Sequence, residues 1–194
     1  LQILALGMLN TVLETAGEHL GLHNGIIELI QGDLCKFLLQ SSQTNDPILL
    51  SLVLRTIFNM FCSVKGHLKV QFEVFFTSIH MGIVESNSAT NPQKELALES
   101  LLDFCREPVL MVDLYTNYDC DVHCTNLFEV LTTSLCKGAS PQSQQEGGSN
   151  GGSGSGSGGS SSSGGSGSSG GSGDSSTSLT TLHVLAFESL LEVL

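Results

Sequence analysis

Apolar residues recur three and four positions apart along the first part of the chain, which is the spacing of one face of an α-helix. In the first sixteen residues this spacing predicts a helix that ends at Gly17. After a turn over residues 21–25, a second helix carries a similar apolar face. The apolar positions of the two helices are Leu1, Leu4, Ala5, Met8, Leu9, Val12, Leu13, Ile26, Ile27, Ile30, Leu34, Phe37 and Leu38. The pattern predicts an antiparallel helix pair.

A second pair begins at Asp46 and Pro47, where Asp can cap a helix and Pro can occupy its first turn. The helix that follows, to Val64, is apolar nearly all round, so we expect it to be central. The next helix carries Leu68, Phe72, Phe75, Phe76, Ile79 and Ile83 at helical spacing. Each buried Phe is worth roughly 2–3 kcal/mol, which predicts a main packing helix. Lys69 and Glu73 stand on its other side, where we expect a solvated pair.

A third group of helices begins at Asn91 and Pro92, which repeat the cap-then-proline signal, and continues through Leu98, Leu101, Leu102 and Cys105. Pro108 opens a short helix (Val109, Val112, Tyr115), and a helix over residues 122–137 follows. The groups begin about 46 residues apart, an interval typical of armadillo or HEAT repeats. No strand-like alternation of useful length occurs. The sequence predicts an all-α fold of armadillo/HEAT-like stacked helical repeats wound into a superhelix.

The composition changes sharply after this helical region. Residues 147–173 are almost only Gly and Ser, which cannot bury enough surface to offset the entropy of ordering. We therefore expect residues 138–178 to be a long disordered Gly/Ser-rich insertion that loops out and returns. Residues 1–137 form the helical region, and residues 179–194 are expected to be its final, truncated helix. The missing initiator Met and the apolar end suggest a piece of a longer protein.

The chain is acidic, with 19 Asp and Glu against 7 Lys and Arg and a formal net charge of −12. This charge argues against nucleic acid as a partner and against direct electrostatic binding to anionic lipid. No uninterrupted apolar run reaches the ~18 residues that a transmembrane helix needs. No basic leader precedes the first helix either, so no secretory signal is predicted.

The sequence offers little catalytic or metal-binding chemistry. Cys120, His123 and Cys124 place three metal ligands within five residues, but structural zinc sites need four ligands. We predict no metal and no cofactor. No phosphate-binding loop, nucleophile elbow or zinc-protease motif occurs, so the chain is not expected to be an enzyme. The six cysteines are expected to be reduced and mostly buried: Cys35, Cys62, Cys105, Cys120, Cys124 and Cys136.

One acidic segment, Asn117-Tyr118-Asp119-Cys120-Asp121, interrupts the helices and is the candidate interaction site. Asn and Asp break helices readily, and Asp121 is expected to cap the next helix near Cys124. Tyr118 offers an aromatic body with a polar tip, and the two Asp residues offer charge. An exposed corner of this kind can bind a basic or polar surface. The simpler alternative is a helix-turn-helix corner with no partner.

The surrounding sequence resembles a known family. Residues 112–129 (VDLYTNYDCDVHCTNLFE) resemble the HUS box of the large Arf guanine-nucleotide exchange factors, a region of homology upstream of their Sec-seven domain. Residues 67–76 (HLKVQFEVFF) and 94–102 (KELALESLL) are similar to two further helices of this family, in the same order. The HUS-box string is nearer the Golgi brefeldin-resistance (GBF/Gea/GNOM-like) branch than the BIG branch.

The resemblance implies an armadillo-like right-handed superhelix that is a non-catalytic regulatory segment, because the exchange activity of these proteins lies in the Sec-seven domain. It implies that the HUS box at 117–121 contacts the N-terminal dimerisation (DCB) domain, and that the segment positions the Sec-seven domain. It further implies a homodimeric, cytoplasmic parent that associates peripherally with Golgi membranes and acts on small GTPases. The alternative is a generic armadillo/HEAT-type adaptor that binds a peptide or small GTPase.

Overall fold

The computed structural model describes residues 1–140 and 174–193, and these residues form helices and connecting turns without any strand. The α-helices are α1 (Gln2–Ala16), α2 (Asn24–Leu29), α3 (Cys35–Ser41), α4 (Pro47–Val64), α5 (Lys69–Phe75), α6 (Gly82–Glu85), α7 (Asn91–Cys105), α8 (Pro108–Leu114), α9 (Leu127–Ala139) and α10 (Asp174–Val193). Short 3-10 and π turns join them: η1 (Gly17–Leu22), η2 (Ile30–Leu34), η3 (Lys65–His67), η4 (Phe76–Met81) and η5 (Tyr115–Asp119). The predicted all-α fold is confirmed.

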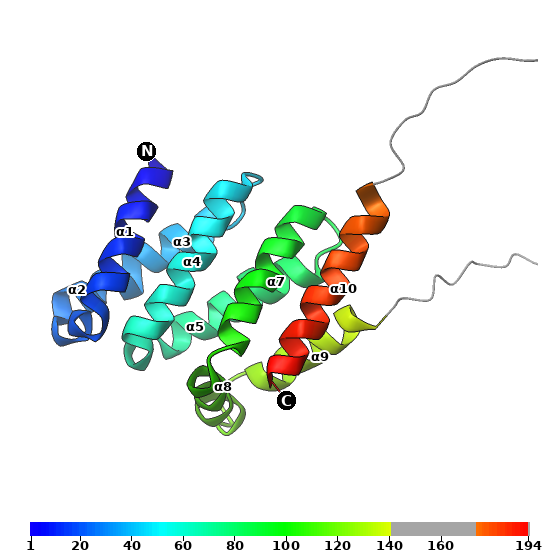
Figure 1. Ribbon diagram of the computed structural model, residues 1–194. Coiled ribbons are helices and arrows are strands. Elements are labelled where there is room, and N and C mark those ends of the chain that lie inside the picture. The colour runs from blue at the N-terminus through cyan, green and yellow to red at the C-terminus, as the bar shows by residue number, and fades with distance from the viewer. Residues whose placement is uncertain (141–173, 194) are drawn as a thin grey trace, which may run out of the picture.

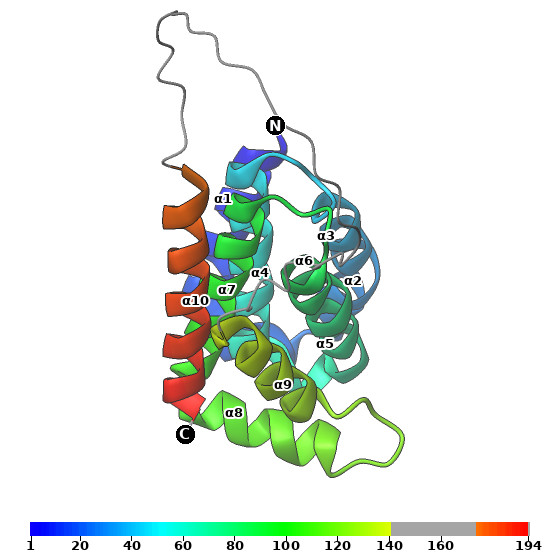
Figure 2. The ribbon, with the colours of Figure 1, turned by 90° about the vertical axis from the view of Figure 1, so that its right-hand side faces the viewer.

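The helices are arranged in two layers. Helices α1, α4, α7 and α10 run side by side in the same direction (Figure 1), and each packs on the next. The segments α2–α3 and α5–α6, together with α9, form a second layer behind them (Figure 2). Helix α8 lies across the lower end of the molecule. The arrangement is consistent with stacked helix pairs, in which each pair covers its apolar face on a neighbour.

Local signals set the ends of the long helices. Gly17 ends α1 with a φ of 51°, a conformation that glycine adopts without steric cost. Asp46 caps α4, because its carboxylate accepts from the amide of Ile48 at 3.0 Å. Helix α7 is capped one residue earlier than the sequence indicates, at Thr90, which forms a reciprocal capping box with Gln93.

Helix α4 is the centre of the core. Its Phe61 stacks on Phe72 of α5 with ring centroids 3.8 Å apart. Phe104 of α7 meets both rings edge-on, at 5.7 and 5.6 Å, and also Phe76 at 5.6 Å. Phe72, Phe75 and Phe76 are all at most 2% exposed, as predicted for a main packing helix. These rings join α4, α5 and α7 across both layers.

The segment Pro47–His67, which contains α4, is the one segment in the described part of the chain that is long and apolar enough to cross a membrane by composition alone. Its most apolar window has a mean hydropathy of 1.7, and 56% of that window is buried inside the fold. Helices α1, α3 and α7 pack against α4. The high hydropathy is therefore explained by its place as a core helix.

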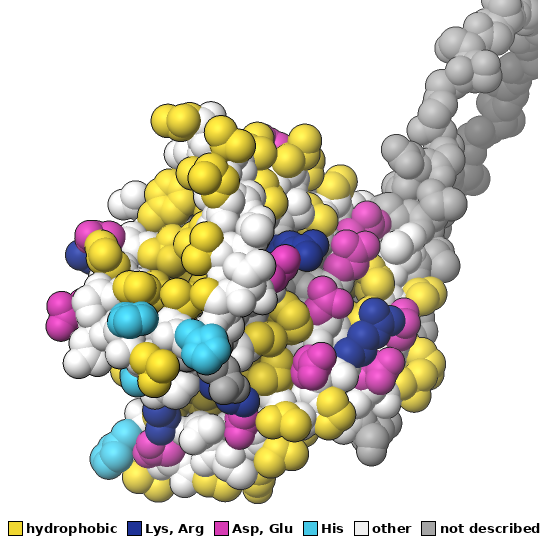
Figure 3. Space-filling model, turned by 60° about the vertical axis from the view of Figure 1, so that its left-hand side comes forward, with side chains coloured by type: hydrophobic (Ala, Val, Ile, Leu, Met, Phe, Trp, Pro, Cys, Tyr) yellow, Lys and Arg dark blue, Asp and Glu magenta, His cyan; other side chains and the backbone are white. Residues whose placement is uncertain are grey.

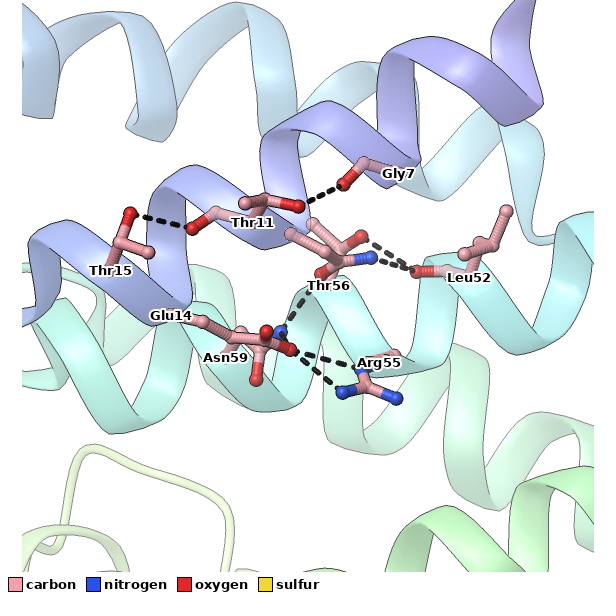
Figure 4. Close-up of polar contacts among 9 residues, drawn as sticks. Gly7, Thr11, Glu14, Thr15, Leu52, Arg55, Thr56 and Asn59 are labelled. Atoms are coloured by element: carbon pink, nitrogen blue, oxygen red, sulfur yellow. Dashed lines mark hydrogen bonds and ion pairs between the residues drawn. The ribbon is translucent and has the colours of Figure 1, made fainter.

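Two of the polar residues that interrupt α4, Arg55 and Asn59, bind α1. Arg55 pairs with Glu14 at 2.8 Å, and Asn59 donates to both Asn10 (3.0 Å) and Glu14 (3.2 Å). Figure 4 shows Glu14, Arg55 and Asn59 pointing toward one another between the two helices. The bond from Arg55 lowers the pKa of Glu14. This polar contact sets which face of α1 lies on α4.

The buried face of α1 differs from the predicted one. Leu6, Asn10 and Leu13 are buried, whereas Leu4 and Met8 are 65% and 64% exposed. The helix is apolar on two sides, so its apolar spacing alone does not decide which side meets α4. The hydrogen bonds of Asn10 to α4 favour the side that carries Asn10.

Helix α10 packs on both α7 and α9. Arg106 at the end of α7 pairs with Glu188 at 2.8 Å. On the other side, His183 Nδ1 lies 2.6 Å from the carbonyl oxygen of Gly138 in α9. A Cβ atom on Gly138 would lie only 3.1 Å from that of the fully buried Ala186. Small residues therefore allow α9 and α10 to approach closely.

The predicted insertion over residues 138–178 lies mostly outside the described residues, since 141–173 are not described. At its two ends the structure is helical: α9 continues to Ala139, and α10 begins at Asp174. The predicted disorder of the intervening residues stays a prediction.

His80 is fully buried in the core beside the aromatic cluster. Its ring centroid lies 5.4 Å from that of Phe76 and 5.6 Å from that of Phe104. Its Nε2 is 3.1 Å from Ser100 Oγ, and its Nδ1 is 3.4 Å from the carbonyl oxygen of Phe75. Burial disfavours the charged imidazolium and lowers the pKa of His80 to about 4. The side chain is therefore a neutral packing residue at pH 7.

We expect Phe104→Ala to lower the free energy of unfolding by about 3–5 kcal/mol, because it leaves a cavity at the meeting point of three helices. Phe104→Leu, which keeps most of the volume, should cost less than about 1.5 kcal/mol. The control is Phe187→Ala. Phe187 is 53% exposed, so its truncation should change the free energy of unfolding little. Urea denaturation measures all three. Equal losses at Phe104 and Phe187 would contradict the core assignment.

His80 predicts a pH dependence of stability. An unfolded histidine has a pKa near 6.5, so between about pH 6.5 and 4 the unfolded chain binds the additional proton. The free energy of unfolding should therefore be highest above pH 6.5. It should fall toward pH 4 by up to roughly 3 kcal/mol, following the size of the pKa shift. Denaturation at pH 7, 6 and 5 measures the slope. His80→Gln should reduce this slope, whereas His123→Gln, at an exposed position, should keep it.

Candidate functional site

The segment Asn117–Asp121 lies where the chain leaves α8 and turns toward α9. Tyr115–Asp119 forms the π turn η5, and Cys120 ends it by donating its amide to the carbonyl of Tyr115 at 3.1 Å. A further turn brings the Cys124 amide to the carbonyl of Asp121 at 3.0 Å. Helix α9 begins only at Leu127, five residues later than the sequence suggests. The segment is a compact corner made of successive turns.

Tyr118 is buried in this corner, with only 3% of its surface exposed. Its hydroxyl donates to the carbonyl oxygen of Lys69 at 2.9 Å, and its ring lies 6.4 Å from that of Phe72. Burial raises the pKa of Tyr118. The expectation that Tyr118 presents its polar tip at an exposed corner is therefore wrong. The hydroxyl has its partner within the fold, because a buried phenol needs one.

Asp119, rather than Asp121, caps the following helix. One carboxylate oxygen of Asp119 accepts from the amide of Phe128 at 2.8 Å, and the other accepts from that of Glu129 at 3.1 Å. These are two of the amides that the first turn of a helix leaves without a helical partner. Asp121 was expected in this role, but α9 starts too late in the chain for it. A carboxylate at this position also suits the helix dipole.

Asp121 instead makes an ion pair with Lys69 at 2.6 Å and accepts from the amide of His123 at 3.0 Å. The bond from Lys69 and that from His123 hold the pKa of Asp121 low, at about 2. A second pair, Lys65 with Asp113, lies beside the first. Both pairs are partly exposed, so each contributes little to stability by itself. Together they join the α4–α5 junction to α8 and to the turn that follows η5.

Two of the motifs noted in the sequence form one unit. Lys69 and Glu73, expected as a solvated pair on α5, both bind the corner: Lys69 meets Asp121, and Glu73 accepts from the amide of Thr125 at 2.8 Å. We call the following residues the corner bracket: Lys69, Glu73, Tyr118, Asp119, Asp121 and Thr125. The bracket joins residues 67–76 to the HUS-box string, since each supplies bonding partners to the other.

Several apolar side chains stay exposed near the corner. Asn117 and Cys120 are the exposed members of the pentad. Beside them, Val109, Val112 and Tyr115 are 64%, 61% and 51% exposed. We call these three residues the α8 stripe. They are the residues that mark this short helix in the sequence, and its buried side is formed instead by Leu110, Met111 and Leu114.

A small pocket opens between the α8 end of the corner and the α4–α5 junction. Its volume is about 200 Å³, and Lys65, Lys69, Asp113 and Tyr118 are among the residues that line it. The four-ligand requirement of structural zinc is not met here, because no group of three or more His, Cys, Asp or Glu side chains suited to a metal lies within the described residues. Cys120 and Cys124 are both free thiols. The geometry indicates a structural corner beside an apolar surface.

The fold and the corner define the class: an all-helical segment of helices packed in two layers. Residues 1–127 match the family described as Mon2/Sec7/BIG1-like, HUS domain. The chain belongs to this family.

Individual relatives agree with this assignment. The ARF guanine-nucleotide exchange factor GNOM of Arabidopsis thaliana is 33% identical over 72% of the chain, which spans 10% of that protein. The human brefeldin A-inhibited guanine nucleotide-exchange protein 1 is 33% identical over 75% of the chain and 8% of its own length. The Golgi-specific brefeldin A-resistance guanine nucleotide exchange factor 1 homolog of Caenorhabditis elegans is 34% identical over 72% of the chain and 7% of its own length. The chain thus spans only 7–10% of the length of these relatives, and the GNOM and brefeldin A-inhibited relatives share the same 33% identity with it.

We expect Asp119→Ala to lower the free energy of unfolding by about 1–2 kcal/mol, because the first turn of α9 loses two hydrogen bonds to a carboxylate. Asp33→Ala is the matched control, since Asp33 is exposed on η2, far from the corner in sequence. Thermal denaturation followed by circular dichroism measures both variants. Indistinguishable midpoints for the two would show that Asp119 does not cap α9.

Proposed function

We propose that this chain is a non-catalytic regulatory and scaffolding segment of an Arf guanine-nucleotide exchange factor. In this proposal the parent is a homodimer that acts in vesicle trafficking, in the cytoplasm and peripherally on Golgi membranes. The segment contacts the DCB domain of the same or a second copy and positions the Sec-seven domain. Membership of the HUS family and the names of the relatives support the proposal.

The observation that carries the proposed DCB contact is the pairing of a rigid corner with an exposed apolar surface. The pentad makes most of its bonds within the fold, so its conformation is held before any partner arrives. The adjacent α8 stripe leaves Val112 and Tyr115 open to a partner. Preorganised apolar and aromatic anchors contribute most of the affinity of protein interfaces. The pentad thus shapes the surface, and the α8 stripe with Asn117 and Cys120 makes the contact.

Binding of a separately produced DCB domain tests this proposal. Val112→Asp places a charge in the proposed interface and should weaken binding at least about tenfold, or about 1.4 kcal/mol. Val70→Asp is the matched control, because Val70 is 68% exposed on α5 and outside the α8 stripe. Isothermal titration calorimetry gives both affinities. Equal affinities would exclude the α8 stripe, and no binding to the unsubstituted chain would contradict the DCB contact.

The pentad itself is tested by Asp119→Ala combined with Asp121→Ala in the same binding assay. Because these carboxylates hold the corner, we expect DCB binding to weaken together with a loss of thermal stability. Binding that is undiminished in this variant would remove the pentad from the contact.

The proposal also places nucleotide exchange outside this chain. Purified chain should therefore leave the rate of nucleotide release from an Arf GTPase unchanged. The measurement follows release of a fluorescent nucleotide, with an isolated Sec-seven domain as the positive control. Acceleration by this chain alone would overturn the non-catalytic assignment.

A second candidate function is a generic armadillo/HEAT-type adaptor that binds a peptide or small GTPase in a groove. The observation that favours it is an open groove between α4 and α7 with a volume of about 550 Å³. Binding of an Arf GTPase to the chain without the DCB domain, and loss of that binding on changing the groove, would favour the adaptor.

A further inference from the structure

The groove between α4 and α7 has an apolar floor. Leu54 and Phe58 of α4 and Leu96 of α7 lie in it, and Leu54 is almost completely buried. Ser51 and Asn59 add polar groups on the α4 side. Its volume of about 550 Å³ lies within the range of natural ligand and peptide sites. The groove can therefore take side chains of a bound segment.

The α7 wall of the groove is acidic. Glu99 and Asp103 line it one helical turn apart on the same face of α7, and Glu107 lines it from the extended residue between α7 and α8. All three are exposed, and none of their side chains makes a hydrogen bond or ion pair within the part of the chain that the structure describes. Figure 3 shows acidic side chains gathered on this side of the molecule. We call these three residues the acidic wall.

Two arginines, Arg55 and Arg106, also line the groove, but they do not neutralise the acidic wall, because each is paired with a carboxylate elsewhere. Arg55 is paired with Glu14 at 2.8 Å, on the side of α1. Arg106 is paired with Glu188 at 2.8 Å and lies 3.7 Å from Glu192, on the side of α10. Each arginine thus has at least one acidic partner outside the groove. The groove keeps an excess of negative charge.

This arrangement does not serve the stability of α7. Glu99 and Asp103 are like charges four residues apart on α7, a spacing that destabilises a helix by a few tenths of a kcal/mol. A cationic ligand would relieve the repulsion. Carboxylates one helical turn apart, beside an apolar floor, match a helix that carries Lys or Arg at the same interval next to an apolar stripe.

A catalytic use of the groove is less consistent with its chemistry. Ser100 lies in the groove and bonds His80, which could suggest a nucleophile and a base. His80 is fully buried and has a pKa of about 4, so it is a weak base at neutral pH. The pair is better explained as a satisfied buried histidine.

We propose that the groove between α4 and α7 binds a basic amphipathic helical segment of a partner protein. Its Lys or Arg residues pair with Glu99, Asp103 and Glu107, and its apolar side chains lie between Phe58 and Leu96. This surface is separate from the α8 stripe, so the inference does not rest on the DCB contact. The electrostatic attraction between the acidic wall and the basic segment would raise the association rate, and it would weaken as the salt concentration rises.

The test uses a fluorescein-labelled synthetic peptide with Lys at every fourth position and Leu along one adjacent face. The comparison peptides have the same composition in scrambled order, and Glu in place of Lys. Fluorescence anisotropy should show that the designed peptide binds and that the Glu peptide does not. Raising the salt concentration from about 50 to about 300 mM should weaken the affinity of the designed peptide at least about tenfold. Equal binding of the scrambled peptide would overturn the proposal, because attraction would then depend on net charge alone.

Variants of the chain locate the site. The groove variant E99Q/D103N/E107Q should weaken binding of the designed peptide at least about tenfold, or about 1.4 kcal/mol. The control E28Q/D33N/E85Q removes the same amount of charge at exposed positions outside the groove and should change affinity little. Equal losses in the two variants would overturn the proposal. Both variants are checked for unchanged helicity, and DCB binding should persist in the groove variant.

Discussion

The structure depends first on the burial of α4. Its Phe61 lies in a cluster with Phe72 and Phe104, so α4, α5 and α7 share a single apolar centre. Each of these three rings packs against the other two, so the helix pairs share one core and do not have separate cores. The placement of the outer helices follows from it: α1 packs on one side of α4, and α10 packs on α7. Both interaction surfaces proposed for the chain are thus carried by helices that the core already fixes in place.

The corner bracket and the groove use polar residues in opposite ways. In the bracket, Asp119 and Asp121 are satisfied within the fold, and they give the corner one conformation. In the acidic wall, Glu99 and Asp103 have no partner in the described chain. Carboxylates bonded within the fold contribute to its shape, whereas exposed, hydrated carboxylates remain available to a partner. A motif that stands out in the sequence can therefore be structural, and a less distinctive set of residues can form a binding surface.

Much of the fold could be predicted from the sequence, because caps and apolar spacing act locally. Asp46, Pro47 and Gly17 set helix ends as expected. The buried faces of α1 and α8 could not be predicted in this way. Both helices are apolar on more than one side, and only the position of a neighbour decides between Leu4 and Leu6 or between Val112 and Met111. The same holds for the partners of Lys69 and Glu73, which come from residues about fifty positions away.

The approach of α9 and α10 has a consequence for how such domains diversify. Their fit relies on Gly138 facing Ala186 and on the bond of His183 to a backbone carbonyl, which are contacts local to the two helices. Closing a longer loop costs only about 0.6 kcal/mol for each doubling of its length. The number of residues between the two helices can therefore drift among lineages at little thermodynamic cost, provided that the small side chains at the crossing are retained.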